Sequence, residues 1–310
     1  MRTRSVVLAV AMLTAVGAAA LAGVTMGTGL SEHADAVKAG TAAAEQAKKA
    51  LGDAPAGLVL VFDSYPKDAK AKLLEGVATV FDRKLIHGCS AAGPITEHGN
   101  PKGPSVGVCA IGGDIEVAAV CSPKIGKDHK AAGAAVGKAL PKMAKAKVLL
   151  LFGNCHLPRN MPLTEGVQTV MGKELPIIGG SSGGPSIDTY FEGEVRGDVA
   201  VGILLGGDFK LAICARPGRK DHDEIVRTAV DATKSAKQGL GAKPALGIYF
   251  ECAGRRGKIK SLQAELDALQ AVIGKDLPLI GFYGTGEIGP KEGGVCKGVG
   301  YHAVCCLIGE

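Results

Sequence analysis

The residues best suited to hold a ligand follow an apolar run near position 250. Cys252, Gly254, Arg255 and Arg256 come directly after the strand-like segment Leu246–Phe250. Open α/β sheets place ligands at the carboxyl ends of their strands. An arginine guanidinium is a planar fork of donors that matches a carboxylate or a phosphate. We therefore predict an anion-binding site at this strand end.

A second set of residues belongs to the same predicted site and lies on a glycine-rich turn after the next apolar strand. Tyr283 and Gly284 lead to Glu287, whose carboxylate suits an amine. Glycine lets a ligand come close to the backbone. The alternative is structural: Glu251 or Glu287 pairs with one of the arginines, and the group holds the fold together without binding a ligand.

Two glycine–serine turns complete the predicted site with Ser90, Ser181 and Ser182. The segment Gly180–Gly184 also matches the nucleophile elbow G-x-S-x-G, and Gly284–Gly289 matches the dinucleotide fingerprint G-x-G-x-x-G. Both motifs need a helix directly afterwards, but a proline follows each of them. We therefore expect neither a serine hydrolase nor a nucleotide-binding loop.

Cysteine and histidine supply the remaining reactive groups. Cys155–His156 and His87–Cys89 suggest thiolate–imidazole pairs, but neighbouring residues of a strand point to opposite faces, and no second cluster has zinc spacing. The nine cysteines are scattered and form no CxxC motif. We predict core cysteines with room for one or two bridges, and no catalytic residue, metal or cofactor. A Cys- or Ser-dependent enzyme of unknown reaction is the alternative.

The elements that position these residues form one unit that recurs three times. Each unit has strands separated by two helical stretches, then a glycine-rich turn and a final strand. The central strands of the units are Leu58–Phe62, Val148–Phe152 and Leu246–Phe250. Helices between short strands favour parallel crossovers, and the hairpin-like turn before the last strand suggests mixed sheets. We predict an α/β fold with mixed sheets built from three internal strand–helix–strand–helix–strand–strand repeats.

Composition places the chain among globular proteins. Hydrophobic residues make up 46% and charged residues 21% of the 310 positions, with a net charge of +6. The lysines are spread along helical stretches, and no aromatic residues are interleaved to stack bases. We therefore expect no nucleic acid among the partners.

The amino terminus resembles an export signal. Arg2 and Arg4 precede an uncharged run from Ser5 to Leu21, and Ala20–Ala22 has the small-x-small pattern of a cleavage site. We predict export, to the periplasm or out of the cell. An uncleaved membrane anchor is the alternative, because the uncharged run continues to Ser31 and is long enough to span a bilayer.

Segments along nearly the whole mature chain match one known pattern. Gly27–Ser31, Leu58–Ser64 and the glycine–serine turns contribute, and Cys252–Arg256 and Gly281–Ile288 are the most specific. In these segments the chain resembles the FIST family of sensory domains. The resemblance implies signal transduction through a bound small ligand, such as an amino acid or other small carboxylate, with a separate signalling protein as partner. A protein-interaction module is a further alternative.

The same resemblance suggests how the chain is divided. We expect a signal peptide or anchor over residues 1–22, an amino-terminal part over residues 23–215 and a carboxy-terminal part over residues 216–310.

Overall fold

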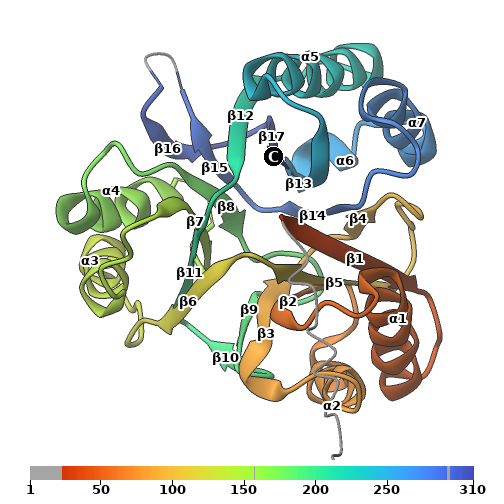
Figure 1. Cartoon of the computed structure of the whole chain (residues 1–310), viewed down its shortest axis with the longest axis horizontal. Helices are drawn as coiled ribbons and strands as arrows, with labels where there is room; N and C mark the ends of the chain where they lie inside the picture. The colour runs from red at the N-terminus through yellow and green to blue at the C-terminus, as the bar shows by residue number, and fades with distance from the viewer. Residues whose placement is uncertain (1–22, 157, 292–293) are drawn as a thin grey trace, which may run out of the picture.

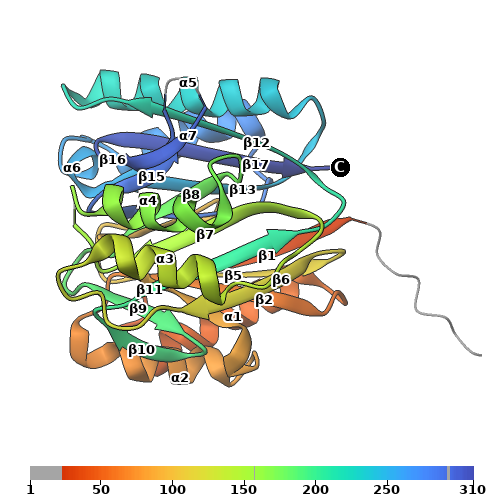
Figure 2. The same cartoon turned by 90° about the vertical axis from the view of Figure 1, so that its left-hand side faces the viewer.

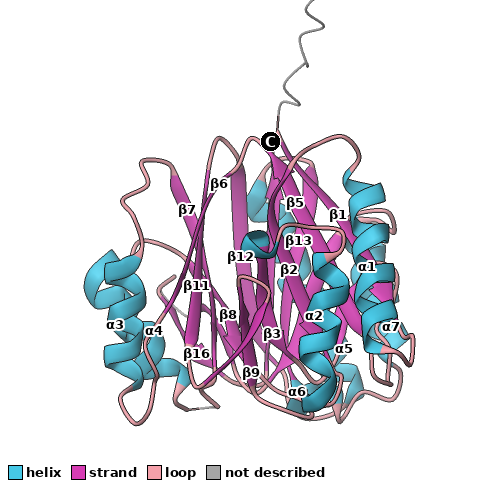
Figure 3. Cartoon of the chain, turned by 90° about the horizontal axis from the view of Figure 1, so that it is seen from below, coloured by secondary structure: helices cyan, strands magenta, loops and turns pink. Residues whose placement is uncertain are grey.

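The computed structural model describes residues 23–156, 158–291 and 294–310, so the predicted signal segment lies outside the described residues. Over this part of the chain, three sheets face a common centre, and helices cover their outer surfaces (Figure 1). Figure 2 shows the helices α5 and α2 on opposite outer sides of the molecule. Figure 3 shows the strands running side by side between flanking helices.

Three consecutive stretches of chain build the sheets. The first contains β1 Val24–Ser31, α1 Ala36–Leu51, β2 Ala56–Asp63, a 3₁₀ turn Lys67–Ala69, α2 Lys70–Ala78, a 3₁₀ turn Arg83–Leu85, β3 Ile86–Ser90, β4 Pro94–Thr96 and β5 Val106–Gly113. The second contains β6 Glu116–Cys121, α3 His129–Ala139, β7 Ala146–Gly153, α4 Asn160–Met171, β8 Ile177–Ser181, β9 Asp188–Phe191, β10 Glu194–Gly197 and β11 Ala200–Gly206. The third contains β12 Lys210–Pro217, α5 His222–Leu240, β13 Pro244–Cys252, α6 Ala253–Arg256, α7 Leu262–Ile273, β14 Leu279–Gly284, β15 Glu287–Pro290, β16 Cys296–Val299 and β17 His302–Gly309.

The strand orders of the sheets are equivalent. Among the described residues they are β1-β5-β2-β3-β9-β10, β6-β11-β7-β8-β15-β16 and β12-β17-β13-β14-β4. The central pairs β2/β3, β7/β8 and β13/β14 are parallel, and the strands beside them are antiparallel. This confirms the predicted α/β class with mixed sheets.

The glycine-rich turns differ from the hairpins that the sequence suggested. After each turn the chain adds a short strand to a neighbouring sheet: β4 pairs with β14, β9 with β3 and β15 with β8. The last strand of each unit then returns between the unit's own first two strands. Each unit therefore contributes one short strand to the sheet of another unit. These contributions connect the three units in a ring.

Aspartate and serine caps explain where the helices α1, α3, α5 and α7 begin. The side chains of Asp35, Asp128, Asp221 and Ser261 each accept a hydrogen bond from a backbone N–H in the first turn of α1, α3, α5 and α7. Such caps satisfy donors that a helix start leaves unpaired. Three of these helices, α1, α5 and α7, end at a glycine with positive φ, which favours termination.

The centre of the molecule is an aromatic cluster supplied by every unit. Phe62, Phe152 and Phe250 occupy equivalent positions near the ends of β2, β7 and β13, and Phe282 comes from β14. Their ring centroids lie between 4.7 and 6.2 Å apart, in tilted and edge-on arrangements. Apolar residues of all three sheets surround them in one buried core. The units therefore form one body.

The predicted boundary between residues 215 and 216 falls inside β12, which pairs with β17 over residues 210–217. Strand pairing divides the chain more naturally into three units than into two parts.

Candidate functional site

A ring of backbone hydrogen bonds connects the three sheets at the carboxyl ends of their central strands. Its three bonds run from Ala92 N to Tyr283 O at 2.8 Å, from Gly183 N to Ser90 O at 3.0 Å and from Thr285 N to Ser181 O at 3.1 Å. The accepting residues are equivalent in the three units, and all three are buried. The structure therefore brings Ser90, Ser181 and Tyr283 together from distant parts of the sequence.

The side chains of the predicted serines bond within the protein. Ser90 Oγ donates to Ser186 O at 2.9 Å, and Ser182 Oγ donates to Gly153 O at 3.3 Å. Ser181 Oγ donates to Cys155 O. These hydroxyls stabilise the turns of the ring in the structure.

Arg255 is fully buried in α6, the short helix after β13. Its Nε and Nη2 lie 2.8 and 2.7 Å from Glu251 Oε1, and Nη2 also donates to Ile225 O at 2.9 Å. Its Nη1 donates to Gly218 O at 3.1 Å and Thr228 Oγ1 at 3.0 Å. Each of the three guanidinium nitrogens therefore donates to at least one protein acceptor. Arg255 thus pairs with Glu251, as in the structural alternative given above.

Beside Arg255 lies a buried network of carboxyl and phenol groups. Tyr249 Oη donates to Glu251 Oε1 at 3.0 Å, and Tyr283 Oη donates to Glu265 Oε2 at 2.6 Å. Burial, together with the nearby Glu251 carboxylate, raises the pKa of Glu265 well above its ordinary value of 4.5. The raised pKa favours the protonated form of Glu265, and Arg255 forms the ion pair with Glu251.

Glu287 is also buried, at the start of β15, and among the described residues it forms no hydrogen bond with this network. Its Oε2 accepts the His302 N–H at 2.9 Å. Burial raises the pKa of Glu287 to about 8, although this backbone bond acts in the opposite direction. Burial and the neighbouring Glu287 also raise the pKa of the Cys252 thiol to about 11.

The glycines of the predicted site lie against protein atoms. A Cβ on Gly254 would lie 2.8 Å from the Tyr301 ring, and one on Gly284 would lie 2.7 Å from Ser181 O. Glycine at these two positions permits close packing between segments.

Arg256 differs from its neighbour because part of its guanidinium has no protein partner. Nη2 donates to Pro101 O at 2.8 Å, and Cζ lies 5.7 Å from the centre of the Tyr283 ring. The buried Nε has no hydrogen-bond partner among the described residues. Asn100 contacts the same tyrosine. Its Nδ2 donates to Tyr283 Oη at 2.7 Å, and its buried Oδ1 also has no hydrogen-bond partner among the described residues. One unpaired donor and one unpaired acceptor thus lie beside the same tyrosine.

Sequence reasoning missed Asn100 and Glu265. Asn100 belongs to the first unit and reaches the third only because β4 pairs with β14. Glu265 lies on an amphipathic helix, where an acidic residue is usually solvated. The fragment Gly99–Asn100–Pro101 has turn chemistry, but no local feature pairs it with residue 283.

The other motifs of the sequence do not converge on a site. Cys155 is buried and His156 is exposed, and burial lowers the pKa of His87 to about 4. Strands rather than helices follow the two glycine motifs: β9 comes after residue 184, and β15 begins within 284–289. Among the described residues, no group of three or more His, Cys, Asp or Glu is placed to hold a metal ion.

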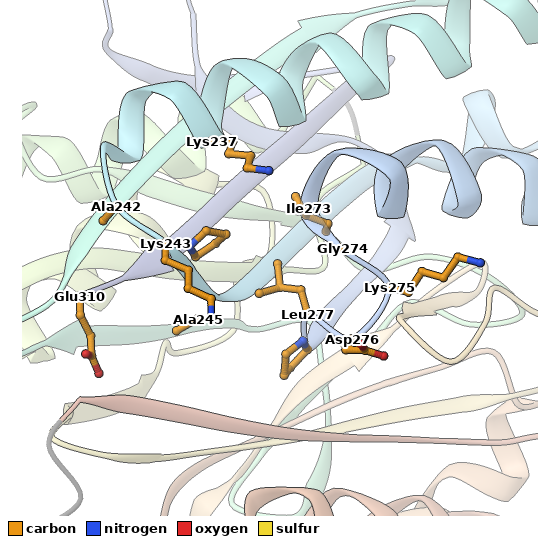
Figure 4. A pocket seen from close by; sticks show the side chains of 12 residues that line it. Lys237, Ala242, Lys243, Ala245, Ile273, Gly274, Lys275, Asp276, Leu277 and Glu310 are labelled. Carbon is orange, nitrogen blue, oxygen red and sulfur yellow. The ribbon is translucent and has the colours of Figure 1, made fainter.

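A separate cavity of about 790 Å³ lies at the other end of β13 and β14 (Figure 4). Pro244 and Pro278 contribute to its apolar wall, and Lys237, Lys243 and Lys275 to its basic one. Lys237 Nζ donates to Val272 O near the carboxyl end of α7. This cavity was not predicted from the sequence. It shares no residue with the polar network.

None of the helices in the described segments combines the length and apolar character needed to cross a membrane.

Comparison with known proteins identifies the family. A model of the FIST N domain matches residues 57–227, and a model of the FIST C domain matches residues 198–290. The chain therefore belongs to the FIST family, which is associated with sensory binding of small ligands in signal transduction. None of the curated proteins matches it in sequence.

Solved structures resemble the chain only distantly. Cyanuric acid hydrolase from A. caulinodans is 11% identical with a TM-score of 0.48, over 93% of this chain and 99% of that one. PurLQS from Thermotoga maritima is 11% identical with a TM-score of 0.29, over 92% and 72% of the two chains. PurL of T. maritima complexed with ATP is 10% identical with a TM-score of 0.28, over 92% and 71%.

Proposed function

We propose that this protein is a sensory module that binds a small carboxylate, with amino acids as the leading class, at the corner formed by Asn100, Arg256 and Tyr283. The supporting observation is the pair of buried groups without partners, Arg256 Nε and Asn100 Oδ1. A buried polar group without a hydrogen bond costs about 1–3 kcal/mol. A ligand that satisfies both groups recovers this cost.

The chemistry of the corner favours a zwitterion. Arg256 Nε needs an acceptor, which a carboxylate supplies with charge assistance. Asn100 Oδ1 needs a donor, which an ammonium group supplies. Gly93 leaves space beside the arginine, because a Cβ there would lie 3.1 Å from Nε. These features support Arg256 rather than Arg255 as the ligand-binding member of the predicted pair.

We propose binding rather than catalysis as the role of the site. The hydroxyls of Ser90, Ser181 and Ser182 donate to backbone carbonyls. The Cys252 thiol, with its pKa raised to about 11, is protonated at neutral pH. Neither arrangement suits an activated nucleophile, which needs a base or a lowered pKa.

A thermal-shift screen of residues 23–310 against the standard L-amino acids and small carboxylates tests the proposal. A ligand at a hundred times its dissociation constant stabilises the native state by about 2.7 kcal/mol. Arg256→Gln should abolish the shift while leaving the unliganded melting temperature within a few degrees. Arg219→Gln, a change at an exposed arginine outside the corner, should leave the shift intact.

An unchanged shift in Arg256→Gln would move binding elsewhere, with the cavity of Figure 4 as the next site to mutate through Lys243. The absence of a shift with every compound would argue against a carboxylate ligand and favour a protein-interaction role.

We also propose that the protein acts after export. The support is the positively charged start, the uncharged run and the small-x-small pattern within residues 1–22. The mass of the protein from its native host should correspond to a chain beginning at Gly23. A membrane-bound product of full mass would instead support the anchor. A full-length product in the cytoplasm would contradict both.

A further inference from the structure

We propose that Cys214 and Cys305 form a dithiol that a small disulfide compound converts to an internal cross-strand disulfide. Cys214 lies on β12, the edge strand of its sheet, and Cys305 lies directly opposite it on β17. Among the ladders of the described residues, this is the one position where two cysteines are register partners.

The ladder sets the spacing between the two cysteines. Gly218 N donates to Tyr301 O at 2.9 Å in the same register, and hydrogen-bonded pairs alternate along an antiparallel ladder. Cys214 and Cys305, four residues further along each strand, therefore form a hydrogen-bonded pair, with Cα atoms about 5.5 Å apart. Disulfides commonly join Cα atoms about 4.4–6.8 Å apart, and opposite residues project from the same face. The Cβ atoms of a hydrogen-bonded pair are about 5.5 Å apart, about 1 Å more than in a disulfide, so the edge strand β12 shifts slightly toward β17 as the bridge closes.

Both side chains lie in the layer beneath α5. Cys305 belongs to the buried core there, and Cys214 packs against that core while remaining half-buried. The Cys214 sulfur contacts Ala215 O at 4.0 Å, a weak contact that is easily given up. A groove of about 430 Å³ along the edge strand includes Cys214 in its wall. A small disulfide therefore reaches Cys214 first.

The reaction is a two-step exchange with the small disulfide RSSR as oxidant. The Cys214 thiolate attacks one sulfur of RSSR, the S–S bond breaks, and the departing thiolate takes up a proton to become RSH. Cys305 loses its proton and attacks the Cys214 sulfur of the mixed disulfide, and the second RSH leaves. Two protein thiols and RSSR thus give one protein disulfide and two RSH. Because burial raises the pKa of Cys305 to about 12, the second step should accelerate with pH.

The experiment incubates reduced residues 23–310 with glutathione disulfide at pH 7 and pH 9 and follows the intact mass. We expect the loss of two hydrogen atoms, a peptide pair joined through Cys214 and Cys305, and faster closure at pH 9. The oxidised protein should melt several degrees higher, because the bridge restricts a long stretch of the unfolded chain. In Cys305→Ser, oxidation should stop at a glutathione adduct on Cys214.

Cys121→Ser is the matched control. Cys121 is also half-buried on an edge strand, but Val201 lies opposite it. This variant should close its internal disulfide like the unmodified protein. A wild-type protein that accumulates the Cys214 adduct without closing, or that joins another pair of cysteines, would overturn the proposal. Circular dichroism of each reduced variant confirms that it is folded.

Discussion

Arg255 and Arg256 are neighbours in the sequence, yet they have different surroundings. Every guanidinium nitrogen of Arg255 donates to a protein acceptor, whereas Arg256 retains a buried Nε without one. The difference arises because the short helix after β13 turns one side chain inward to Glu251 and the other toward the first unit. Residue type alone predicted a donor fork at both positions. Only the fold shows that Arg255 is held by protein acceptors and that Arg256 is the candidate ligand contact.

Glu287 should make stability depend on pH. Its pKa is about 8 in the folded protein and ordinarily 4.5, so the native state keeps a proton that the unfolded chain releases. The associated stability is complete below pH 4.5 and is lost as the pH rises through 8. Glu265 acts in the same direction because its pKa is also raised. The free energy of unfolding should fall by a few kcal/mol between pH 5 and pH 8, at about 1.4 kcal/mol for each pKa unit.

Urea unfolding at the two pH values measures this effect. Glu287→Gln should lose less stability than the unmodified protein over the interval, because the amide does not titrate. Glu75→Gln, a change at an exposed position on α2, serves as the control and should keep the full dependence. Equal pH dependence in Glu287→Gln and the unmodified protein would show that the carboxyl at position 287 titrates alike in both states.

Glycines set the spacing of two helix pairs at the scale of elements. In α3 and α4, a Cβ on Gly133 would lie 2.0 Å from Leu163 O, and one on Gly166 would lie 2.0 Å from Lys130 O. Gly40 and Gly76 make the same reciprocal contact between α1 and α2. The helices of these pairs therefore touch through their backbones.

Gly166→Ala should destabilise the protein although alanine favours helices. Overpacking typically costs about 1–3 kcal/mol, against a helix-propensity gain of about 1 kcal/mol. Gly239→Ala in α5 is the control, since its Cβ would lie 3.5 Å from the nearest atom, and it should be neutral or slightly stabilising. Urea midpoints compare the two variants. A Gly166→Ala protein as stable as the unmodified one would show that α3 and α4 can separate at little cost.

The elements themselves were largely predictable from local pattern. Leu58–Phe62 and its two counterparts are apolar strands, and helices such as α1 and α5 begin at aspartate caps. The destination of the strand after each glycine turn was not predictable. A three- or four-residue segment such as Pro94–Thr96 carries too little pattern to indicate which sheet it joins.

At the scale of the whole molecule, the same strand exchange explains what was missed in the site. Residues of the predicted cluster do gather near the ends of β13 and β14, because parallel strands end at one edge of a sheet. Asn100 arrives there from a different unit, about 180 positions away in the chain. The shared phenylalanine core then fixes the units relative to one another, so the corner at Tyr283 depends on all three.

The described chain enters and leaves the molecule at neighbouring points. The Glu310 side chain lies against Gly23, where an added Cβ would come 1.7 Å from its carboxylate. A short peptide could join these points and make the polypeptide a closed loop, which could then be opened at an exposed turn between units. Circular permutation is tolerated where ends are close and exposed. Packing therefore does not dictate which unit comes first, and a permuted chain beginning at the second unit should reach the same three-part ring.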